Sequence, residues 1–213
     1  MIEAIIFDLD GTLIDTEPLH CASYKEAFEA HGIELTEEQF YEHWTKKGKG
    51  VKDFLLERRV DLDIEKFRVQ KRQLYHSKLQ TTQLLIEGVI ETLPYLNSRY
   101  RLAVATSSWR VDAEFALQKA GIEGYFETVV TANEVKKEKP DPECFLLASS
   151  RLNMEPQEAI VIEDSEKGII AAHRAGMKSI AIPNQYTAYH DFSLATKIVA
   201  GIRQISSDLV SAL

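Results

Sequence analysis

AIIFDLDGTLID, residues 4–15, joins an apolar run directly to an acidic turn that contains glycine. The run 4–9 predicts a short buried strand. Asp8 and Asp10 are two residues apart, so an extended chain presents both side chains on one side, and Gly11 permits a sharp turn without a Cβ clash. Carboxylates beside a core cost free energy unless something offsets their charge. The end of this strand therefore indicates a functional site.

The composition is that of a soluble globular protein. The 213 residues allow one or two domains, and 45% hydrophobic with 27% charged residues is near the average. A formal net charge of -8 argues against a nucleic-acid partner, which usually requires a basic face. Cys21 and Cys144 are in no metal-ligand spacing, so we expect packing residues.

The N-terminus does not resemble a secretory signal, because Glu3 stands where a basic residue would be usual. No apolar run approaches the length of a membrane span. We expect a cytoplasmic protein with no nucleic-acid or membrane partner, as a monomer or weak homodimer.

Two parts of the chain differ in hydrophobic period. Residues 16 to about 80 follow a helical period, and Cys21, Tyr24, Phe28 and His31 mark one face of a helix that Gly32 is expected to end. From about residue 84 onward, strands and helices alternate. The predicted strands are 101–106, 127–130, 159–164 and 178–182, with a short one near 198–199. The predicted helices are about 110–120, 142–152 and 166–175, with a final helix at the C-terminus.

This alternation predicts an α/β fold with a doubly wound parallel, Rossmann-like sheet. The first strand then belongs to the later sheet, and the helical stretch is an insertion. We expect a core domain from residues 1–15 and 84–213 and a small α-helical domain from residues 16–83.

Polar side chains follow several of these strands directly. Ligands bind beyond the carboxyl ends of the strands in sheets of this kind, so such residues are site candidates. The candidates at strand ends are Asp8, Asp10, Thr106, Ser107, Ser108, Glu163 and Asp164, and Lys139 lies on a loop before a helix.

The carboxylates predict a bound cation. Asp8, Asp10 and Asp164 would repel one another in one cleft unless a positive ion lay among them, and hard oxygen ligands favour Mg²⁺. The alternative for Asp164-Ser165 is a helix cap.

Lys139 precedes a proline in KPDP and is the lysine expected to reach a phosphate oxygen and help to keep Asp8 ionised. Lys136 and Lys137 fit a solvated charge run instead. The hydroxyls of residues 106–108 suit phosphate binding at a helix N-terminus, or capping of the helix that begins near Arg110.

Four ordered motifs resemble those of the haloacid dehalogenase superfamily: DLDGTLID, the threonine after RLAVA, the lysine of KPDP, and IEDSEKG. Their spacing, and the insertion between the first two, are similar to the beta-phosphoglucomutase-like subgroup with a helical cap. The similarity spans nearly the whole chain. It implies that residues 16–83 are a cap domain and that the chain is a phosphoric monoester hydrolase.

The resemblance also implies roles for residues. Asp8 would be the nucleophile that forms an aspartyl-phosphate, and Asp10 the general acid and base. Asp8, the backbone carbonyl of Asp10 and Asp164 would bind Mg²⁺, with Glu163 a direct or indirect contributor. Thr106 and Lys139 would hold the phosphoryl oxygens.

Some positions depart from relatives within the superfamily. Asp10 is the second aspartate that true dehalogenases lack, which argues against halide displacement. Sugar-phosphate mutases carry an arginine in the cap and a basic residue after the serines, where this chain has Val51 and Trp109. Arg110 could substitute for the second. These departures favour hydrolysis over mutase chemistry.

The insertion offers two further candidates. His20 matches a cap-hinge histidine that would contact substrate or gate proton transfer, although a histidine on a helix surface is the alternative. Lys46, Lys47, Lys49 and Lys52 could close over an anionic substrate or belong to a solvated loop. Trp44 beside them is either core or substrate-facing.

The leading hypothesis is a Mg²⁺-dependent phosphatase for a small phosphorylated metabolite, with a sugar phosphate as one option. The alternatives are a beta-phosphoglucomutase-like isomerase and a phospho-acceptor signalling domain. An inserted cap argues against the signalling domain, because receiver domains have open phosphorylation sites.

Overall fold

A computed structural model of the chain describes residues 1–82 and 85–213. The chain forms two compact units, Met1–Asp15 with Leu84–Leu213 and Thr16–Gln83. The predicted boundary at residues 83 and 84 lies outside the described residues. That the smaller unit acts as a cap stays a prediction.

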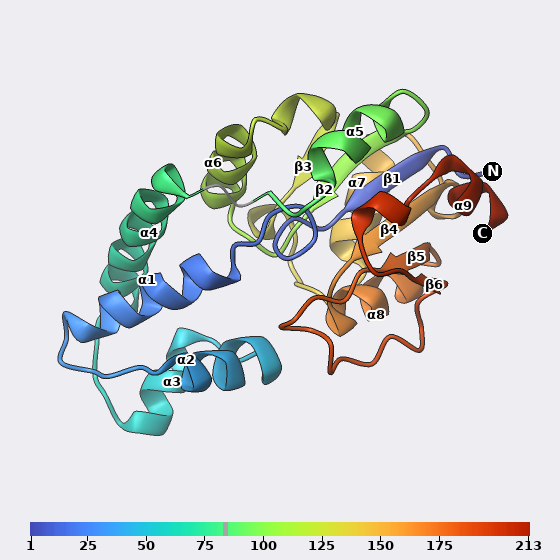
Figure 1. The fold of residues 1–213 in the computed structure, drawn as a ribbon. Coiled ribbons are helices and arrows are strands. Elements are labelled where there is room, and N and C mark those ends of the chain that lie inside the picture. The colour runs from blue at the N-terminus through green and yellow to red at the C-terminus, as the bar shows by residue number, and fades with distance from the viewer. Residues whose placement is uncertain (83–84) are drawn as a thin grey trace. The chain divides into compact units, whose positions relative to one another are not determined.

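The larger unit is built on a parallel sheet that has six strands among the described residues, in the order β3-β2-β1-β4-β5-β6 (Figure 1). The prediction of a doubly wound α/β fold is confirmed. Several strands end one or two residues earlier than predicted, because the chain leaves the sheet where the polar residues begin. The strands are β1 (Ala4–Phe7), β2 (Arg101–Ala105), β3 (Thr128–Val130), β4 (Ala159–Glu163), β5 (Lys178–Ala181) and β6 (Lys197–Ile198).

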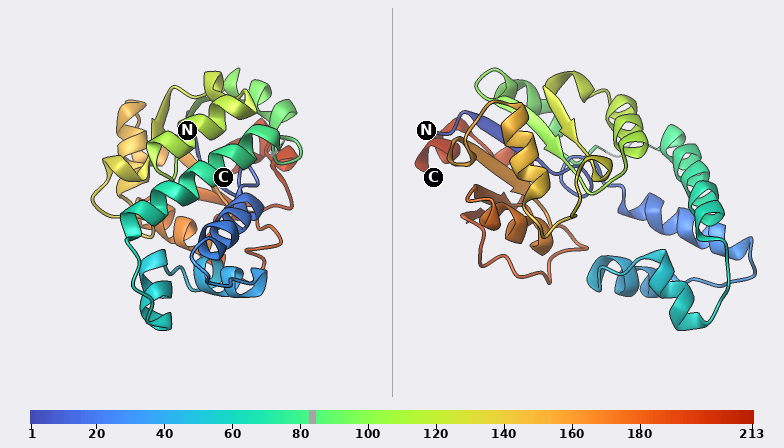
Figure 2. Two further views of the ribbon diagram at one scale, coloured as in Figure 1. Left: turned by 90° about the vertical axis from the view of Figure 1, so that its left-hand side faces the viewer. Right: turned by 180° about the vertical axis from the view of Figure 1, so that it is seen from behind.

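Helices cover both faces of this sheet. They are α5 (Val89–Asn97), α6 (Arg110–Ala120), α7 (Glu143–Arg151), α8 (Glu166–Arg174) and α9 (Ser207–Ala212). Helices α6, α7 and α8 lie close to their predicted ranges and α9 is the predicted C-terminal helix, whereas α5 was not predicted. Side chains alternate along β1, so Ala4 and Ile6 pack with α7 while Ile5 and Phe7 are buried on the opposite face. Helix α7 lies behind the sheet in Figure 1 and in front of it in the rear view of Figure 2.

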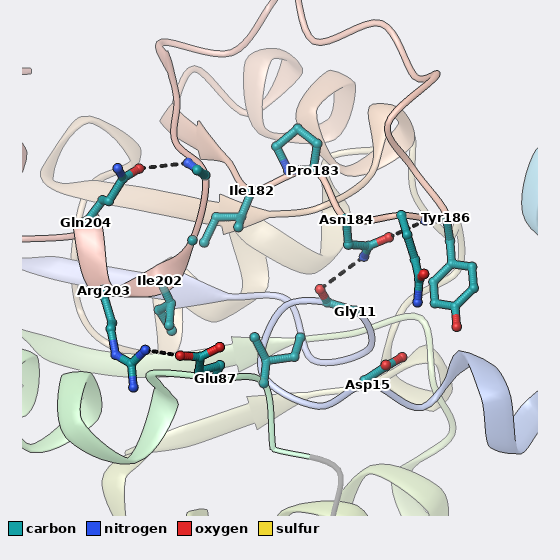
Figure 3. Close-up of a pocket in the computed structure, with 14 residues that line it drawn as sticks. Gly11, Asp15, Glu87, Ile182, Pro183, Asn184, Tyr186, Ile202, Arg203 and Gln204 are labelled. Carbon is teal, nitrogen blue, oxygen red and sulfur yellow. Dashed lines mark hydrogen bonds and ion pairs between the residues drawn. The ribbon is translucent and has the colours of Figure 1, made fainter.

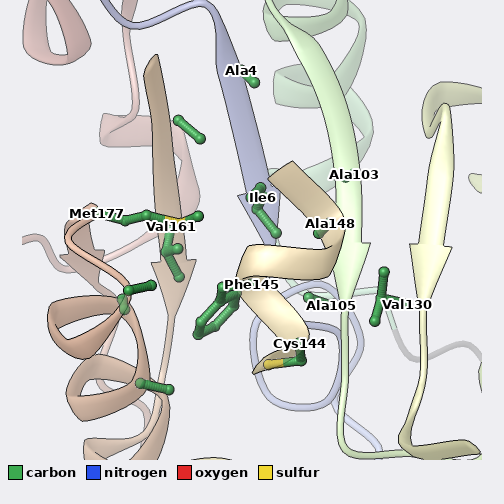
Figure 4. Packing of buried hydrophobic residues seen from close by; sticks show 14 of the residues in the cluster. Ala4, Ile6, Ala103, Ala105, Val130, Cys144, Phe145, Ala148, Val161 and Met177 are labelled. Atoms are coloured by element: carbon green, nitrogen blue, oxygen red, sulfur yellow. The ribbon is translucent and has the colours of Figure 1, made fainter. Parts of the chain in front are cut away.

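The core under α7 is closely packed. Figure 4 shows α7 across β1 and β2, with Phe145 turned towards Val161 of β4. Cys144 is buried in the same cluster, and Cys21 is buried in the core of the smaller unit; both are free thiols. The prediction that the cysteines are packing residues is confirmed.

The strand register gathers the site at one edge of the sheet. Phe7 of β1 is aligned with Val104 of β2 on one side and with Ile162 of β4 on the other. Because all three strands run in the same direction, the residues that follow them leave the sheet together. The central position of β1 thus places its aspartates between the ends of β2 and β4.

The smaller unit is helical, as predicted. It contains α1 (Glu17–Glu29), α2 (Glu37–Phe40), a π-helical turn (Tyr41–Lys46), α3 (Val51–Arg58) and α4 (Ile64–Thr81). Its core is aromatic, with the rings of Phe28 and Phe67 centred 4.4 Å apart. Helix α1 ends at Glu29, so the prediction that His31 belongs to its apolar face is wrong.

Within the described ranges, no helix combines the length and the hydropathy that a membrane span requires.

Candidate active site

Lys139 is the centre of the site. Its ammonium group is almost fully buried and donates to Asp8 Oδ1 at 2.6 Å, to Glu163 Oε1 at 3.0 Å and to the carbonyl of Ala105 at 2.9 Å. All three donor positions of an ammonium are therefore used. One cation from the loop before α7 links the ends of β1, β2 and β4.

Glu163 is enclosed by its own turn. Its Oε2 accepts from the backbone N–H of Ser165 at 2.6 Å and from the Ser165 hydroxyl at 2.8 Å, so both carboxylate oxygens have protein donors. Gly168 makes room for it, because a Cβ there would stand 1.8 Å from Glu163 Oε1. Ser165 caps α8 through the N–H of Gly168 at 3.2 Å. The cap alternative thus holds for Ser165 and leaves the Asp164 side chain to the site.

Three carboxylates meet where the sequence predicted a cation. One oxygen from each of Asp8, Glu163 and Asp164 lies within 4.8 Å of the others, and all three side chains are buried. The donor set is entirely carboxylate oxygen, which suits a hard divalent ion such as Mg²⁺. Among the described residues Lys139 is the one cation in contact with these acids, and a divalent ion would offset the negative charge that remains when all three are ionised. These residues therefore fit a divalent cation.

Asp10 lies beside this group and has different partners. Its Oδ2 accepts from the hydroxyl of Ser108 at 2.6 Å and from that of Thr106 at 3.2 Å. Thr106 Oγ1 in turn accepts from the backbone N–H of Ser108 at 2.9 Å. The two hydroxyls thus hold the carboxylate of Asp10.

The alternative that one of these hydroxyls caps α6 is wrong. The N-cap residue is Trp109, and the first N–H of the helix, on Arg110, donates to Asn133 Oδ1 at 2.8 Å. The Ser107 side chain is half-buried and makes no hydrogen bond with the residues that the structure describes. Its assignment to phosphate binding stays a prediction.

Burial dominates the electrostatics of the site. It raises the pKa of Asp8 to about 7; Lys139 opposes the shift, and Glu163 and Asp10 add to it. Burial, then Glu163 and Asp8, raise the pKa of Asp164 well above its usual range. Lys139 was expected to keep Asp8 ionised, but it is shared with Glu163 and only partly offsets burial.

The pKa values of Glu163 and Lys139 are shifted by the contact between these two side chains and by their other partners. Burial alone would raise the pKa of Glu163, but Lys139 and the N–H of Ser165 lower it below its ordinary value. Burial alone would lower the pKa of Lys139, and the attraction of Asp8 and Glu163 raises it instead. The Lys139–Glu163 pair is therefore ionised.

The other basic side chains near the site are exposed or paired with residues outside it. Lys136 and Lys137 are exposed, as predicted for a solvated charge run. The Arg110 guanidinium donates to Glu114 at 2.7 Å, to the carbonyl of Val129 at 3.2 Å and to Glu134. Its charge is already balanced by two carboxylates, so the suggestion that it replaces the basic residue of the mutases is not supported.

His20 belongs to the smaller unit. Its ring stacks on Tyr75 with centroids 4.5 Å apart, and Lys71 Nζ donates to its Nδ1 at 2.6 Å. Burial, and then the charge of Lys71, lower the pKa of His20 well below its usual value. The ring is half-buried against Tyr75 and Lys71, which disfavours a freely solvated surface histidine, and a role towards substrate stays a prediction.

The lysine-rich segment of the smaller unit pairs locally. Lys46 and Lys47 contact Glu42 at 3.1 and 3.3 Å, and Lys49 contacts Glu57 at 2.6 Å, all near the surface. This favours the solvated alternative. Trp44 packs among Tyr24, Phe40 and Phe54 in the aromatic core, so it is a core residue.

One residue of the site was not predicted. Asn184 follows β5 and donates from Nδ2 to Asp164 Oδ2 at 2.8 Å. The signal was present, because Asn184 is a polar residue just beyond the end of an apolar strand. The rule that singled out Asp8 and Asp164 applies equally to the fifth strand.

Comparison with known proteins shows the family of the chain. Residues 5–182 match the model of the haloacid dehalogenase-like hydrolase family. The chain is 37% identical over 183 residues to the phosphorylated carbohydrates phosphatase of Thermotoga maritima, with 84% of each chain covered.

Two solved structures are similar across almost their full length. CbbY from Rhodobacter sphaeroides in complex with phosphate superimposes with a TM-score of 0.84, 27% identity and 96% of each chain covered. Beta-phosphoglucomutase from Clostridium difficile gives a TM-score of 0.83 at 25% identity, covering all of this chain and 96% of the other. The fold, the acidic group around Lys139 and these similarities lead to one conclusion: the chain belongs to the haloacid dehalogenase-like hydrolase family, with beta-phosphoglucomutase-like neighbours.

Proposed function

We propose that this protein is a phosphatase that hydrolyses the phosphate ester of a small phosphorylated carbohydrate. The observation that carries the proposal is the pairing at the sheet edge, where Lys139 holds Asp8 and two hydroxyls hold Asp10. The similarity to a phosphatase of phosphorylated carbohydrates supports the substrate class.

In this proposal Asp8 and Asp10 divide the chemistry. A carboxylate oxygen of Asp8 attacks phosphorus and forms an aspartyl-phosphate, while the bond from phosphorus to the ester oxygen breaks. Asp10 gives its proton to that leaving oxygen. It then takes a proton from a water that attacks phosphorus, the bond to Asp8 breaks, and inorganic phosphate is released.

Other side chains support these steps. Lys139 orients Asp8 and places a positive charge beside the phosphoryl oxygens, and Thr106 and Ser108 keep the Asp10 carboxylate in place. Asp8, Asp164 and the backbone carbonyl of Asp10 would hold Mg²⁺, with Glu163 held back by Lys139 and Ser165. When bound, the ion would supply positive charge that stabilises the phosphoryl group in the transition state.

A mutase is the second candidate, because a beta-phosphoglucomutase has nearly the same fold. Two observations weigh against it. Val51 and Trp109 occupy the positions where the sugar-phosphate mutases carry basic residues, and Arg110 is engaged with Glu114 and Glu134. A phospho-acceptor signalling domain is disfavoured by the match to a hydrolase family.

The test is phosphate release from a panel of sugar, polyol and nucleoside monophosphates with Mg²⁺ present. We expect turnover of at least one sugar phosphate, and Asp8→Asn should abolish it while circular dichroism shows that the protein still folds. Asp10→Asn should slow turnover by about 10²–10⁴-fold, the usual contribution of general acid-base catalysis.

The alternatives give different results on the same protein. Conversion of a sugar 1-phosphate to its 6-phosphate that depends on added sugar bisphosphate would establish the mutase. Absence of phosphate release across the whole panel would refute the phosphatase, and so would full activity of Asp8→Asn.

A further inference from the structure

The loop after β5 reaches the site through one side chain. Asn184 Nδ2 donates to Asp164 Oδ2 at 2.8 Å and to the carbonyl of Gly11 at 3.3 Å. The two acceptors belong to segments more than 150 residues apart in sequence, one after β1 and one after β4. A single amide group therefore joins the loops after β1, β4 and β5.

The orientation of this amide is fixed by its surroundings. Asn184 Oδ1 accepts from the backbone N–H of Tyr186 at 2.8 Å, and the backbone N–H of Asn184 donates to Thr187 Oγ1 at 3.0 Å. A flipped amide would place its oxygen against a carboxylate and a carbonyl, and its NH₂ group against an N–H donor. Only the observed orientation satisfies all of these groups.

Asp164 has little room to move within this contact. Gly11 has a φ of +88°, and a Cβ on it would stand 2.4 Å from Asp164 Oδ2 and 3.1 Å from Asn184 Nδ2. The turn after the first aspartates therefore touches the side chains of both Asp164 and Asn184. The carboxylate of Asp164 is confined by Gly11 on one side and oriented by the amide of Asn184.

We propose that Asn184 is a positioning residue that holds the Asp164 carboxylate in the orientation required to bind a divalent cation. This inference rests on the proposed function, in which Asp164 is a ligand of the ion. Hydrogen-bond partners of metal ligands fix the direction of the ligand, and their loss typically weakens metal binding 10–100-fold.

Asn184 is well suited to a clean substitution. It borders a cavity of about 460 Å³ in the larger unit, whose lining also includes Gly11, Pro183 and Arg203 (Figure 3). A side chain at the wall of an open cavity contributes less packing than one in a filled core. Exchange of the amide for an apolar group of similar size should therefore leave the fold intact.

The experiment is a titration of the whole protein with Mn²⁺ as probe. The electron paramagnetic resonance signal of the free ion measures how much Mn²⁺ is bound at each step. We expect wild-type protein to bind one Mn²⁺ and Asn184→Leu to bind it 10–100-fold more weakly, with an unfolding temperature within about 2 °C of wild type. Asn184→Ala is the second variant and should show the same loss. In phosphatase assays, saturating Mg²⁺ should restore the kcat of Asn184→Leu to within a few-fold of wild type.

Two neighbours on the same loop are matched controls. Gln185→Ala changes an exposed residue of the cavity lining, and Thr187→Val removes the loop hydrogen bond to Asn184 but keeps the amide. Both should bind Mn²⁺ within 3-fold of wild type, a margin of about 0.7 kcal/mol.

The outcomes separate the two proposals. Equal affinity in wild type and Asn184→Leu would overturn the inference and leave the phosphatase standing. A loss in Thr187→Val as large as in Asn184→Leu would also overturn it, because loop order rather than the amide would then set the affinity. If wild type bound no Mn²⁺, the metal-dependent function would fail, and the inference with it.

Discussion

Replacement of Lys139 by methionine should destabilise the larger unit strongly. Methionine has nearly the length of lysine, so the substitution removes the charge and its hydrogen bonds while it keeps most of the volume. Asp8 and Glu163 would then be left buried and close together, without the ammonium that lies 2.6 Å from one and 3.0 Å from the other.

The magnitude follows from these distances. At an effective dielectric constant of about 20, each contact is worth about 6 kcal/mol of gross Coulomb attraction, much of which offsets the cost of burial. Loss of one partner from a buried ion pair typically costs about 3–5 kcal/mol. In a protein of this size that lowers the unfolding temperature by about 6–20 °C. The variant should fold, but with a large part of a usual 5–15 kcal/mol stability lost.

Calorimetry in the presence of EDTA would measure the effect, because chelation keeps divalent ions from replacing the lysine. Lys136→Met is the matched control, because Lys136 is an exposed lysine three residues before Lys139, and it should change the unfolding temperature by less than about 2 °C. Adding Asp8→Asn to Lys139→Met should recover part of the loss, since it removes one of the two stranded charges.

The pH dependence of this variant has a defined sign. The pKa of Asp8 is already raised to about 7 with the lysine present, and without it the pKa would rise further. A folded state that binds more protons than the unfolded state loses stability as pH rises. Lys139→Met should therefore be more destabilised at pH 8 than at pH 5. Stability equal to wild type at pH 8, or no recovery on adding Asp8→Asn, would refute this account of Lys139.

Three further predictions concern other contacts. Gly168→Ala places a Cβ 1.8 Å from Glu163 Oε1, so the Glu163 side chain must move away from its partners. Calorimetry should show the free energy of unfolding reduced by about 3–5 kcal/mol. An unchanged unfolding temperature would contradict this prediction. Ser108→Ala removes the hydroxyl that donates to Asp10 at 2.6 Å. If that charge-assisted bond is worth about 1–2 kcal/mol in the transition state, kcat should fall about 5–30-fold with KM little changed. Steady-state kinetics would measure both constants. Burial lowers the pKa of His20 well below 6.5, so protonation of this imidazole favours the unfolded chain. Urea titrations should show the free energy of unfolding falling by up to about 1.4 kcal/mol per pH unit below pH 6.5. His20→Gln should make that pH dependence weaker.

The strand ends were predictable because their signals are local. An apolar run followed at once by Asp8 and Asp10, or by Glu163 and Asp164, marks a strand that leaves a core at a polar edge. In a parallel sheet the carboxyl ends of the strands lie at the same edge, independently of the side chains that follow them. The same reasoning covers Asn184, which follows β5.

The hydrogen bonds and ion pairs between side chains were harder to predict from the sequence. That Ser108 holds Asp10, and that Arg110 turns to Glu114 and Glu134, depends on the path of the chain after β2. Likewise, His20 is packed on Tyr75 because α1 and α4 lie against each other. A single sequence does not encode these distances in any short pattern.

The parallel α/β sheet, the helical insertion and the polar residues at the strand ends follow from local signals, because hydrophobic period and turn chemistry can be recognised in the sequence. The sharing of charge between these residues depends on the three-dimensional fold. The alignment of β1 with β2 and β4 lets one buried ammonium serve both Asp8 and Glu163, and the turn at Gly11 brings Asn184 against Asp164. Hydrogen bonds and ion pairs depend on separations of a few ångströms between distant segments, and packing alone sets those separations.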